Sequence, residues 1–161
     1  MMNYKIKYGI AGGIISSILG TLNWLIIARP MGVSASQLVG YMSIAISLLC
    51  IPFGIRYFRD KLNEGKVSFS QGIKIGLGIT CMAGLVMAIH SMLFFLFQKD
   101  EFIEWQKRDL DESALMAYNE QLAQMPDFAF APWFQAIIMF TMVFLIGAAI
   151  NLISSAVLKK E

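Results

Sequence analysis

The sequence predicts an all-α membrane protein with four transmembrane helices and an outer amphipathic helix in the third loop. The first reason is composition: 57% of the 161 residues are apolar and 15% are charged, with a mean hydropathy of +0.63. A soluble domain is about half apolar and a quarter charged. The second reason is that the apolar residues gather in four long runs, none of which contains Asp, Glu, Lys or Arg. We expect residues 1–161 to form a single integral membrane domain.

The four runs predict spans at residues 8–28, 38–55, 75–97 and 133–158. Each is close to the roughly 20 residues that a helix needs to cross the hydrocarbon core. The first run is too long for the apolar core of a signal peptide, so we expect an uncleaved anchor. The second is the shortest and has Pro52 near its end, and none of the four is clearly broken by Gly or Pro at its middle.

The basic residues predict the orientation. Nine of the 13 Lys and Arg lie in the N-terminal segment, the connection 56–74 and the C-terminal segment, which share one side if there are four spans. Cytoplasmic loops have an excess of Lys and Arg. We therefore expect both termini and this connection to be cytoplasmic, with residues 29–37 and 98–132 outside.

The connection also has local signals. Residues 63–65, Asn-Glu-Gly, predict a turn, and Ser68 or Ser70 can cap the third helix. The functional alternative is a docking site for an acidic partner or a lipid headgroup. We interpret the stretch as a topology determinant on a solvated hairpin.

The stretch FRDKLNEGKVSFSQGIKIG, residues 58–76, resembles a family of small bacterial membrane proteins catalogued as domain of unknown function number 4199. The resemblance rests on Arg59–Lys61, Gly65–Phe69 and Gly72–Gly76, and it extends in span order over nearly the whole chain. It implies a four-helix integral protein of the bacterial cytoplasmic (inner) membrane. It implies no known activity and no functional residues.

Rows of small residues at four-residue spacing predict where helices pack, because helices in lipid associate through close contact and polar bonds. The rows do not tell whether the partner is in this chain or in another copy. The third span has one row and the first span has two overlapping rows. Their members are Gly72, Gly76, Thr80, Gly84 and Ala88 in the third span, and Gly12, Ser16 and Gly20 beside Gly9, Gly13, Ser17 and Thr21 in the first.

Three polar residues inside the spans, Asn23, His90 and Asn151, are candidates for function. Asn23 and His90 each lie about 22 Å from the cytoplasmic start of their spans, so they can bond each other if spans one and three touch. A proton relay or a ligand contact is the functional alternative. We interpret the residues as structural, because no span has a carboxylate and a lone histidine makes no metal site.

The loop 98–132 has 35 residues and a net charge of −5. Leu115, Tyr118, Leu122 and Met125 recur at intervals of three and four, which predicts an amphipathic helix that ends before Pro126. We expect this helix to cap the outer mouth of the bundle or to meet a partner domain.

The acidic residues of the loop do not follow the order of a calcium-binding loop, so we interpret them as a solvated face. Asp109 and Glu112 have capping-box spacing at the start of the predicted helix.

Little in the sequence indicates chemistry. Cys50 and Cys81 fall inside apolar runs and are interpreted as packing residues, so no metal, cofactor or catalytic set is expected. The preferred function is a non-catalytic membrane protein that assembles with itself or with a membrane partner in the lipid bilayer. The alternative is a subunit of a small oligomeric transporter or channel. An intramembrane enzyme is disfavoured, because it needs a nucleophile and base, paired acids or metal ligands. The net charge of +2 is too small to suggest nucleic acid.

Overall fold

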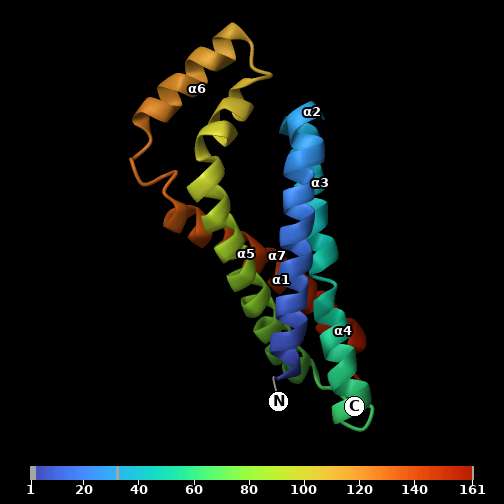
Figure 1. Cartoon of the computed structure of the whole chain (residues 1–161). Coiled ribbons are helices and arrows are strands. Elements are labelled where there is room, and N and C mark those ends of the chain that lie inside the picture. The colour runs from blue at the N-terminus through green and yellow to red at the C-terminus, as the bar shows by residue number, and fades with distance from the viewer. Residues whose placement is uncertain (1–2, 32, 161) are drawn as a thin grey trace.

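The computed structural model describes residues 3–31 and 33–160 (Figure 1). Within these residues the chain is helical apart from turns, short connections and one isolated backbone bridge. In chain order the elements are α1 (Tyr4–Leu22), the π-helical segment η1 (Asn23–Ala28), α2 (Arg29–Met31), α3 (Val33–Ser47), α4 (Cys50–Tyr57), the π-helical segment η2 (Phe58–Leu62), α5 (Phe69–Lys107), α6 (Glu112–Gln124) and α7 (Pro132–Leu158).

Four helical segments are long and apolar enough to cross a membrane, as expected of a multi-pass membrane protein. They are Tyr4–Ala28, Val33–Leu62, Phe69–Lys107 and Pro132–Leu158. Each contains one of the four predicted spans, so the prediction of an all-α protein with four apolar helices is confirmed.

Both chain ends and the connection between η2 and α5 lie at one end of the bundle, which we call the terminal end (Figure 1). The opposite end, with α2 and α6, is called the far end. Backbone bonds tie the C-terminus to the connection: the Val67 N–H donates to the Lys160 carbonyl at 2.7 Å, and the Lys160 N–H donates back at 2.9 Å. The predicted turn is present, with positive φ at Glu64 (51°) and Gly65 (81°).

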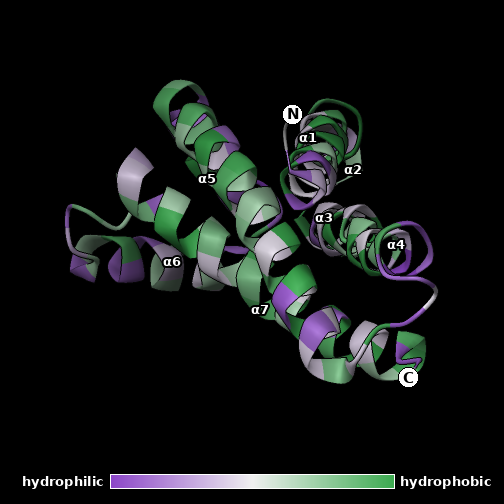
Figure 2. Cartoon of the chain, turned by 90° about the horizontal axis from the view of Figure 1, so that it is seen from below, coloured by the Kyte–Doolittle hydropathy of each residue, from purple (hydrophilic) through white to green (hydrophobic). Residues whose placement is uncertain are grey.

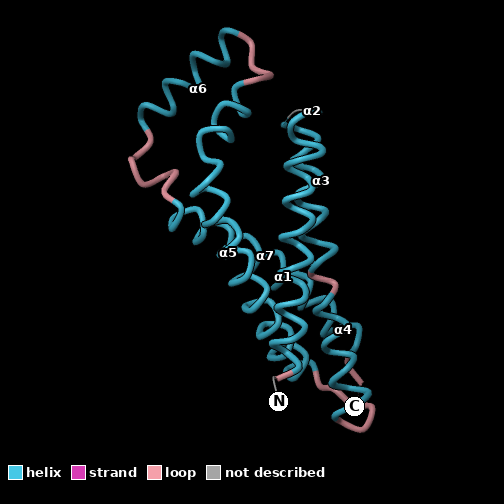
Figure 3. Tube along the Cα trace, viewed as in Figure 1, coloured by secondary structure: helices cyan, strands magenta, loops and turns pink. Residues whose placement is uncertain are grey.

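The second span is broken, against the expectation that no span is. Residues 48 and 49 form a turn between α3 and α4, seen as a short loop within the helical trace in Figure 3. The cause is Pro52, which has no N–H and whose ring clashes with the carbonyl four residues earlier. The backbone N–H groups of Leu49 and Ile51 bond to carbonyls three residues back, at 3.1 and 3.0 Å. Helix continues to Leu62, so Pro52 lies inside the segment rather than near its end.

The third span is longer than its apolar run. Ser68, one of the two predicted caps, begins α5 with a capping box: its Oγ accepts from the Gln71 N–H at 3.2 Å, and Gln71 Oε1 accepts from the Ser68 N–H at 2.9 Å. The helix then runs for 39 residues, about 58 Å at 1.5 Å per residue. That exceeds a hydrocarbon core of about 30 Å. The predicted loop therefore begins as helix, held by residues such as Glu104 and Lys107, which pair at 2.8 Å.

The helix α6 lies in the predicted loop, but Asp111 caps it instead of Asp109. The Asp111 carboxylate accepts from the Ala114 N–H at 2.8 Å. The four predicted apolar positions are half-buried. The Tyr118 hydroxyl donates to Gln106 on α5 at 2.6 Å. In Figures 1 and 2, α6 lies beside α5 on the side away from α1 and α3, so it does not cover the space between them.

The helix α5 is central: it packs against α7 and α1, while α4 packs against both α5 and α7. The buried apolar core lies where α4, α5 and α7 meet and includes Ile51, Ile55, Ile79 and Val143. Hydrophobic residues run along most of the helices (Figure 2), and many large apolar side chains are exposed, as expected of helices that contact lipid.

Candidate functional site

The small-residue row of α5 faces α7. A Cβ added at Gly72 would meet Ser155, one at Gly76 would overlap the Asn151 amide, and one at Gly84 would come within 3.0 Å of the Phe140 ring. Thr80 is packed in the same way against Gly147 of α7, and Ala88, at the far end of the row, is only half-buried. The row is therefore used by a contact inside this chain.

The rows of α1 divide between two neighbours. Gly12 lies against Ser47 and Cys50 of the second span, and Gly9 and Gly13 lie against α5. Ser16 and Gly20, which belong to the same row as Gly12, line a cavity between the helices.

Asn151 joins two helices and is only 1% exposed. Its Nδ2 donates to the Ile73 carbonyl of α5 at 3.0 Å, and its Oδ1 accepts from the Ser155 hydroxyl at 3.1 Å. Both ends of the amide have a partner within the protein, as expected of a structural bond between helices.

Asn23 and His90 do not bond each other, although the sequence allowed it. Asn23 Nδ2 donates to the Ser36 carbonyl at 2.9 Å and contacts its hydroxyl at 3.1 Å, while His90 Nε2 lies 3.0 Å from Thr21 Oγ1. The reason is helix geometry: residues two apart point about 200° apart around the axis. Because Thr21 faces α5, Asn23 faces α3 instead.

The pair of Thr21 and His90 is not arranged as a nucleophile and its base. The Thr21 hydroxyl has one proton, and it donates to the Ser17 carbonyl at 2.9 Å. Both contacts of the hydroxyl are satisfied together only if His90 Nε2 carries a proton and donates to Thr21. A general base needs that nitrogen unprotonated.

A cavity of about 340 Å³ lies between α1 with η1, α3, α5 and α7. Its wall combines aromatic and methionine side chains with uncharged polar groups, and His90 is its one ionisable side chain other than tyrosine among the described residues. No described lining residue is Asp, Glu, Lys or Arg. Lining residues with exposed side chains belong to α3 and α7, for example Tyr41 (50% exposed) and Ile138 (38%). The cavity therefore opens sideways between α3 and α7.

Three buried polar atoms on side chains that line this cavity have no hydrogen-bond partner in the described protein: Ser16 Oγ, Asn23 Oδ1 and Trp24 Nε1. Ser16 is 3% exposed and Trp24 is 8% exposed. Leaving such a group unpaired costs about 1–3 kcal/mol. Three of them on the lining of one cavity indicate a place where another molecule, either water or a ligand, supplies the partners.

The π-helical segment η1 positions two of these groups, Asn23 and Trp24. Short π-helical stretches are frequent at functional sites. The Trp24 ring packs edge-on against Phe94 and Trp105, with centroids 5.2 and 5.4 Å apart. Trp105 Nε1 donates to the Ala28 carbonyl at 2.6 Å, so this indole is satisfied while that of Trp24 is not.

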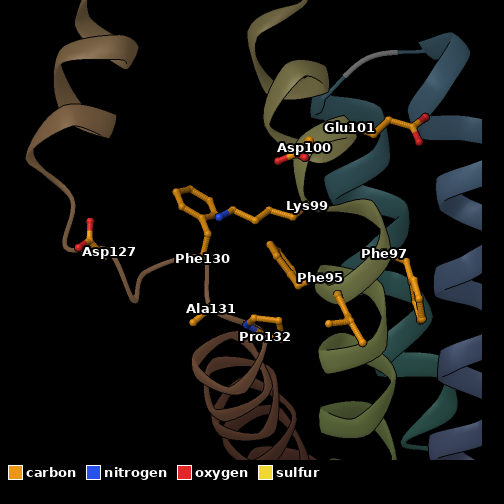
Figure 4. Close-up of a pocket in the computed structure, with 10 residues that line it drawn as sticks. Phe95, Phe97, Lys99, Asp100, Glu101, Asp127, Phe130, Ala131 and Pro132 are labelled. Carbon is orange, nitrogen blue, oxygen red and sulfur yellow. The ribbon is translucent and has the colours of Figure 1, made fainter.

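A second hollow, of about 530 Å³, lies on the surface between α5 and the start of α7 (Figure 4). In Figure 4 the Lys99 side chain extends toward the Phe130 ring, and the carboxylates of Asp100, Glu101 and Asp127 do not converge. Across the described residues, no group of three or more His, Cys, Asp or Glu is placed to hold a metal ion. This hollow offers no ordered set of ligands, and the cavity is the better candidate site.

The sequence identified part of the cavity. Asn23 and His90 were candidates as intramembrane polar residues, and Ser16 and Gly20 were candidates for packing. Trp24 was missed, because a tryptophan in a span is ordinarily an apolar or interfacial residue. The second span supplies much of the opposite wall of the cavity. Its small and polar residues were the signal from which the sequence could have indicated that wall.

A sequence model of one protein family, described as "Protein of unknown function (DUF4199)", matches residues 7–160. The match covers nearly the whole chain, so the chain belongs to this family. No curated protein and no solved structure matches the chain.

Proposed function

Since the family to which this chain belongs has no assigned activity, we propose a function from the site: the protein is a non-catalytic multi-pass membrane protein that binds a small molecule in the cavity between α1 with η1, α3, α5 and α7. One observation carries the proposal: Ser16, Asn23 and Trp24 all line that cavity, and each has a buried polar atom without a hydrogen-bond partner in the described protein. The volume of about 340 Å³ is within the range of about 300–1,000 Å³ of ligand pockets.

The chemistry of the wall supports binding without catalysis. The described lining residues include no carboxylate, lysine or cysteine. Because the Thr21 hydroxyl also contacts the Ser17 carbonyl, the pair satisfies both contacts with His90 as the donor, which does not favour His90 as the base of a nucleophile. A site of this kind can hold and orient a molecule through hydrogen bonds and apolar contact.

The proposal places the protein in a bacterial inner membrane with both termini cytoplasmic. The support is the family resemblance together with the basic residues, nine of which lie in the segments at the terminal end. The cavity then lies toward the outer side. In a variant without Cys50 and Cys81, a single cysteine at Ser113 should react with an impermeant thiol reagent on intact cells, and one at Ser68 should not. Labelling at Ser68 from outside would reverse the orientation.

Filling the cavity tests the proposed function. A Cβ at Gly40 would meet only Asn23 Nδ2, at 3.6 Å, so Gly40→Leu can fill the cavity without a clash at its first carbon. Native mass spectrometry of the protein in mild detergent should show a retained small molecule on the native protein and its loss from Gly40→Leu. Gly78→Leu, outside the cavity and close only to Lys5, is the matched control and should retain it. Equal retention by Gly40→Leu would place the binding elsewhere.

A transporter or channel subunit is the second candidate. The broken second span and the π-helical η1 favour it, because transporter sites are typically formed by discontinuous helices. Transport requires the cavity to open, in turn, to each side of the membrane. A single cysteine at Ser43, in a background without Cys50 and Cys81, should then react with polar thiol reagents added on either side. Reaction from one side only would count against transport.

Assembly with a second copy or with a membrane partner is a further part of the proposal. The row of α5 and three glycines of α1, Gly9, Gly12 and Gly13, are used inside the chain, so an interface would be formed on the lipid-facing surface. The exposed polar residues at the cavity mouth, Gln37 and Tyr41, support a contact there. Crosslinking in native membranes should give a dimer band that depends on a cysteine placed at Gln37. The same yield from a cysteine at Ile153, exposed on α7, would mean random collision.

A further inference from the structure

We infer that the ligand is an uncharged amphiphile with a hydroxyl group at its polar end, and that it enters the cavity sideways from the lipid between α3 and α7. This inference rests on the proposed function and adds the chemical class of the ligand. It follows from the unpaired atoms, from the uncharged wall and from the position of the mouth.

The unpaired atoms require a ligand group that both donates and accepts. Trp24 Nε1–H only donates. Asn23 faces the carbonyl of Ser36, which only accepts, so the amide nitrogen must lie on that side and Oδ1 is left as the unpaired acceptor. The Ser16 hydroxyl can do either. A ligand hydroxyl can accept from Trp24 and donate to Asn23, whereas an ether, a ketone or a hydrocarbon cannot do both.

The wall excludes charge. With no Asp, Glu, Lys or Arg among the described lining residues, a carboxylate or an ammonium would be buried without a counter-charge. Burying an unpaired charge costs far more than burying a neutral polar group. His90 is the one described lining side chain that could take a positive charge, and its Nε2 already contacts Thr21 at 3.0 Å, so that nitrogen is not offered to a ligand.

The rest of the wall fits an apolar body. Phe94 and Phe102 lie around the Trp24 ring, and Met87, Met139 and Met142 complete the wall toward α7. Methionine adapts its shape to flexible apolar groups. The mouth lies on the membrane-facing flank between two spans, so a molecule already dissolved in the lipid can enter with its polar end first.

Photo-crosslinking of the full chain in membranes tests the class of ligand. The probe is a long-chain alcohol with a diazirine in its chain, and three matched probes carry a carboxylate, an amine or no polar group. The alcohol should label peptides of η1 and α3 severalfold more than the other three, and excess unlabelled alcohol should compete. Labelling of the lipid-facing side chain of Ile153 should be similar for all four, which controls for partition into the membrane.

Two variants test the hydrogen bonds. Trp24→Phe keeps most of the ring and removes the N–H, so cavity labelling by the alcohol should fall about 3–10-fold. Trp133→Phe is the matched control, because Trp133 is exposed at the start of α7 and does not line the cavity. The thermal aggregation temperature of each variant in one detergent shows whether the fold is intact. If Trp24→Phe unfolds, Ser16→Ala takes its place.

The outcomes separate the two proposals. Cavity labelling by the acid or the amine at the level of the alcohol would overturn the ligand class and leave the binding function standing. Alcohol labelling that is lost in Gly40→Leu but unchanged in folded Trp24→Phe would also overturn the class, because the N–H would not be used. Absence of cavity labelling by all four probes, with Ile153 labelled normally, would overturn the ligand class and its entry from the lipid, whereas the proposed binding function would still be decided by native mass spectrometry of Gly40→Leu.

Discussion

The two ends of the contact between α1 and α5 differ in the size of the residues that form it. At the terminal end, Gly9 and Gly13 bring α1 so close that an added Cβ would overlap α5. Farther along, Thr21 and then Trp24 face α5, and the helices diverge toward the far end (Figure 1). Close backbones leave no space between helices, and larger contact residues hold them apart. The cavity lies where this separation begins, beside Ser16 and Gly20.

Two asparagines show the same difference. Asn151 lies in the tight α5–α7 contact, with both ends of its amide bonded within the protein. Asn23 lies beside the cavity, with its Oδ1 unpaired. A polar residue in a close helix contact becomes a structural bond, whereas the same residue beside an open space keeps bonding capacity for another molecule.

The largest effect is expected from forcing apart the close contact between α5 and α7 near the terminal end. Gly76→Leu would push its side chain into the Asn151 amide and force α5 and α7 apart. Overpacking costs about 1–3 kcal/mol in a well-packed interior. The thermal aggregation temperature in one detergent should fall clearly for Gly76→Leu and little for Gly78→Leu, which meets only the flexible Lys5 side chain. A similar loss for both would mean that helix propensity, not the contact, is the cause.

The second effect separates the two asparagines. Asn151→Leu leaves the Ile73 carbonyl without its side-chain donor and the Ser155 hydroxyl without its acceptor. Hydrogen bonds between membrane helices contribute about 0.6 kcal/mol on average, so a loss of about 1 kcal/mol is expected. Asn23→Leu should lower the free energy of unfolding by less than Asn151→Leu does. It loses the bonds to Ser36, but it also removes a buried oxygen that has no partner. Equilibrium unfolding in mixed micelles measures both. A larger loss for Asn23→Leu would contradict the distinction between the two ends.

A smaller effect is expected at His90. His90→Gln keeps a donor that can reach Thr21, and His90→Leu removes it, so only the second should lose roughly 0.6 kcal/mol. The same unfolding measurement applies. If His90→Gln accumulates normally but abolishes a pH-dependent phenotype of the cell, the histidine acts as a proton carrier and not as a structural donor.

Much of the fold follows from the sequence because the apolar runs and the turn at Glu64 and Gly65 are local features. The small-residue spacing also marked the α5 row. It could not name the neighbour, since the residue that covers Gly76 is Asn151, far away in the chain. The break at residues 48 and 49 was missed because the apolar run ended soon after Pro52, while the helix does not.

The cavity was less accessible to sequence reasoning. Its wall joins residues from four helices, and its volume depends on how far those helices diverge. Ser16 fits a packing row by spacing, and only the structure shows that it lines the cavity and that its buried Oγ has no hydrogen-bond partner in the described protein. The Trp105 indole bonds the Ala28 carbonyl, 77 residues away in the chain, whereas the Trp24 indole has no partner, and the spacing of residues in the sequence indicates neither.

The smallest effect concerns α6, which stands apart from the bundle and depends on its own cap. The Ala114 N–H and then the Ser113 hydroxyl bond the Asp111 carboxylate and lower its pKa in the folded helix. A carboxylate with a lowered folded pKa stabilises the helix above its unfolded pKa of about 3.9 and loses that contribution as the pH falls through the folded value. Amide hydrogen exchange in the first turn of α6, corrected for the intrinsic pH dependence, should therefore accelerate below about pH 4.

Asp111→Asn also caps a helix but does not titrate in this range, so its corrected exchange rate should not change with pH. Backbone amides at the terminal end, such as those of α5 near Gly76, should show no such change in exchange rate in either protein. An equal acceleration in Asp111→Asn would show that a carboxylate other than Asp111 stabilises α6. No acceleration in either protein would mean that α6 is held by α5 through Tyr118 and Gln106, and the far end would then be less independent of the bundle than its exposed surface indicates.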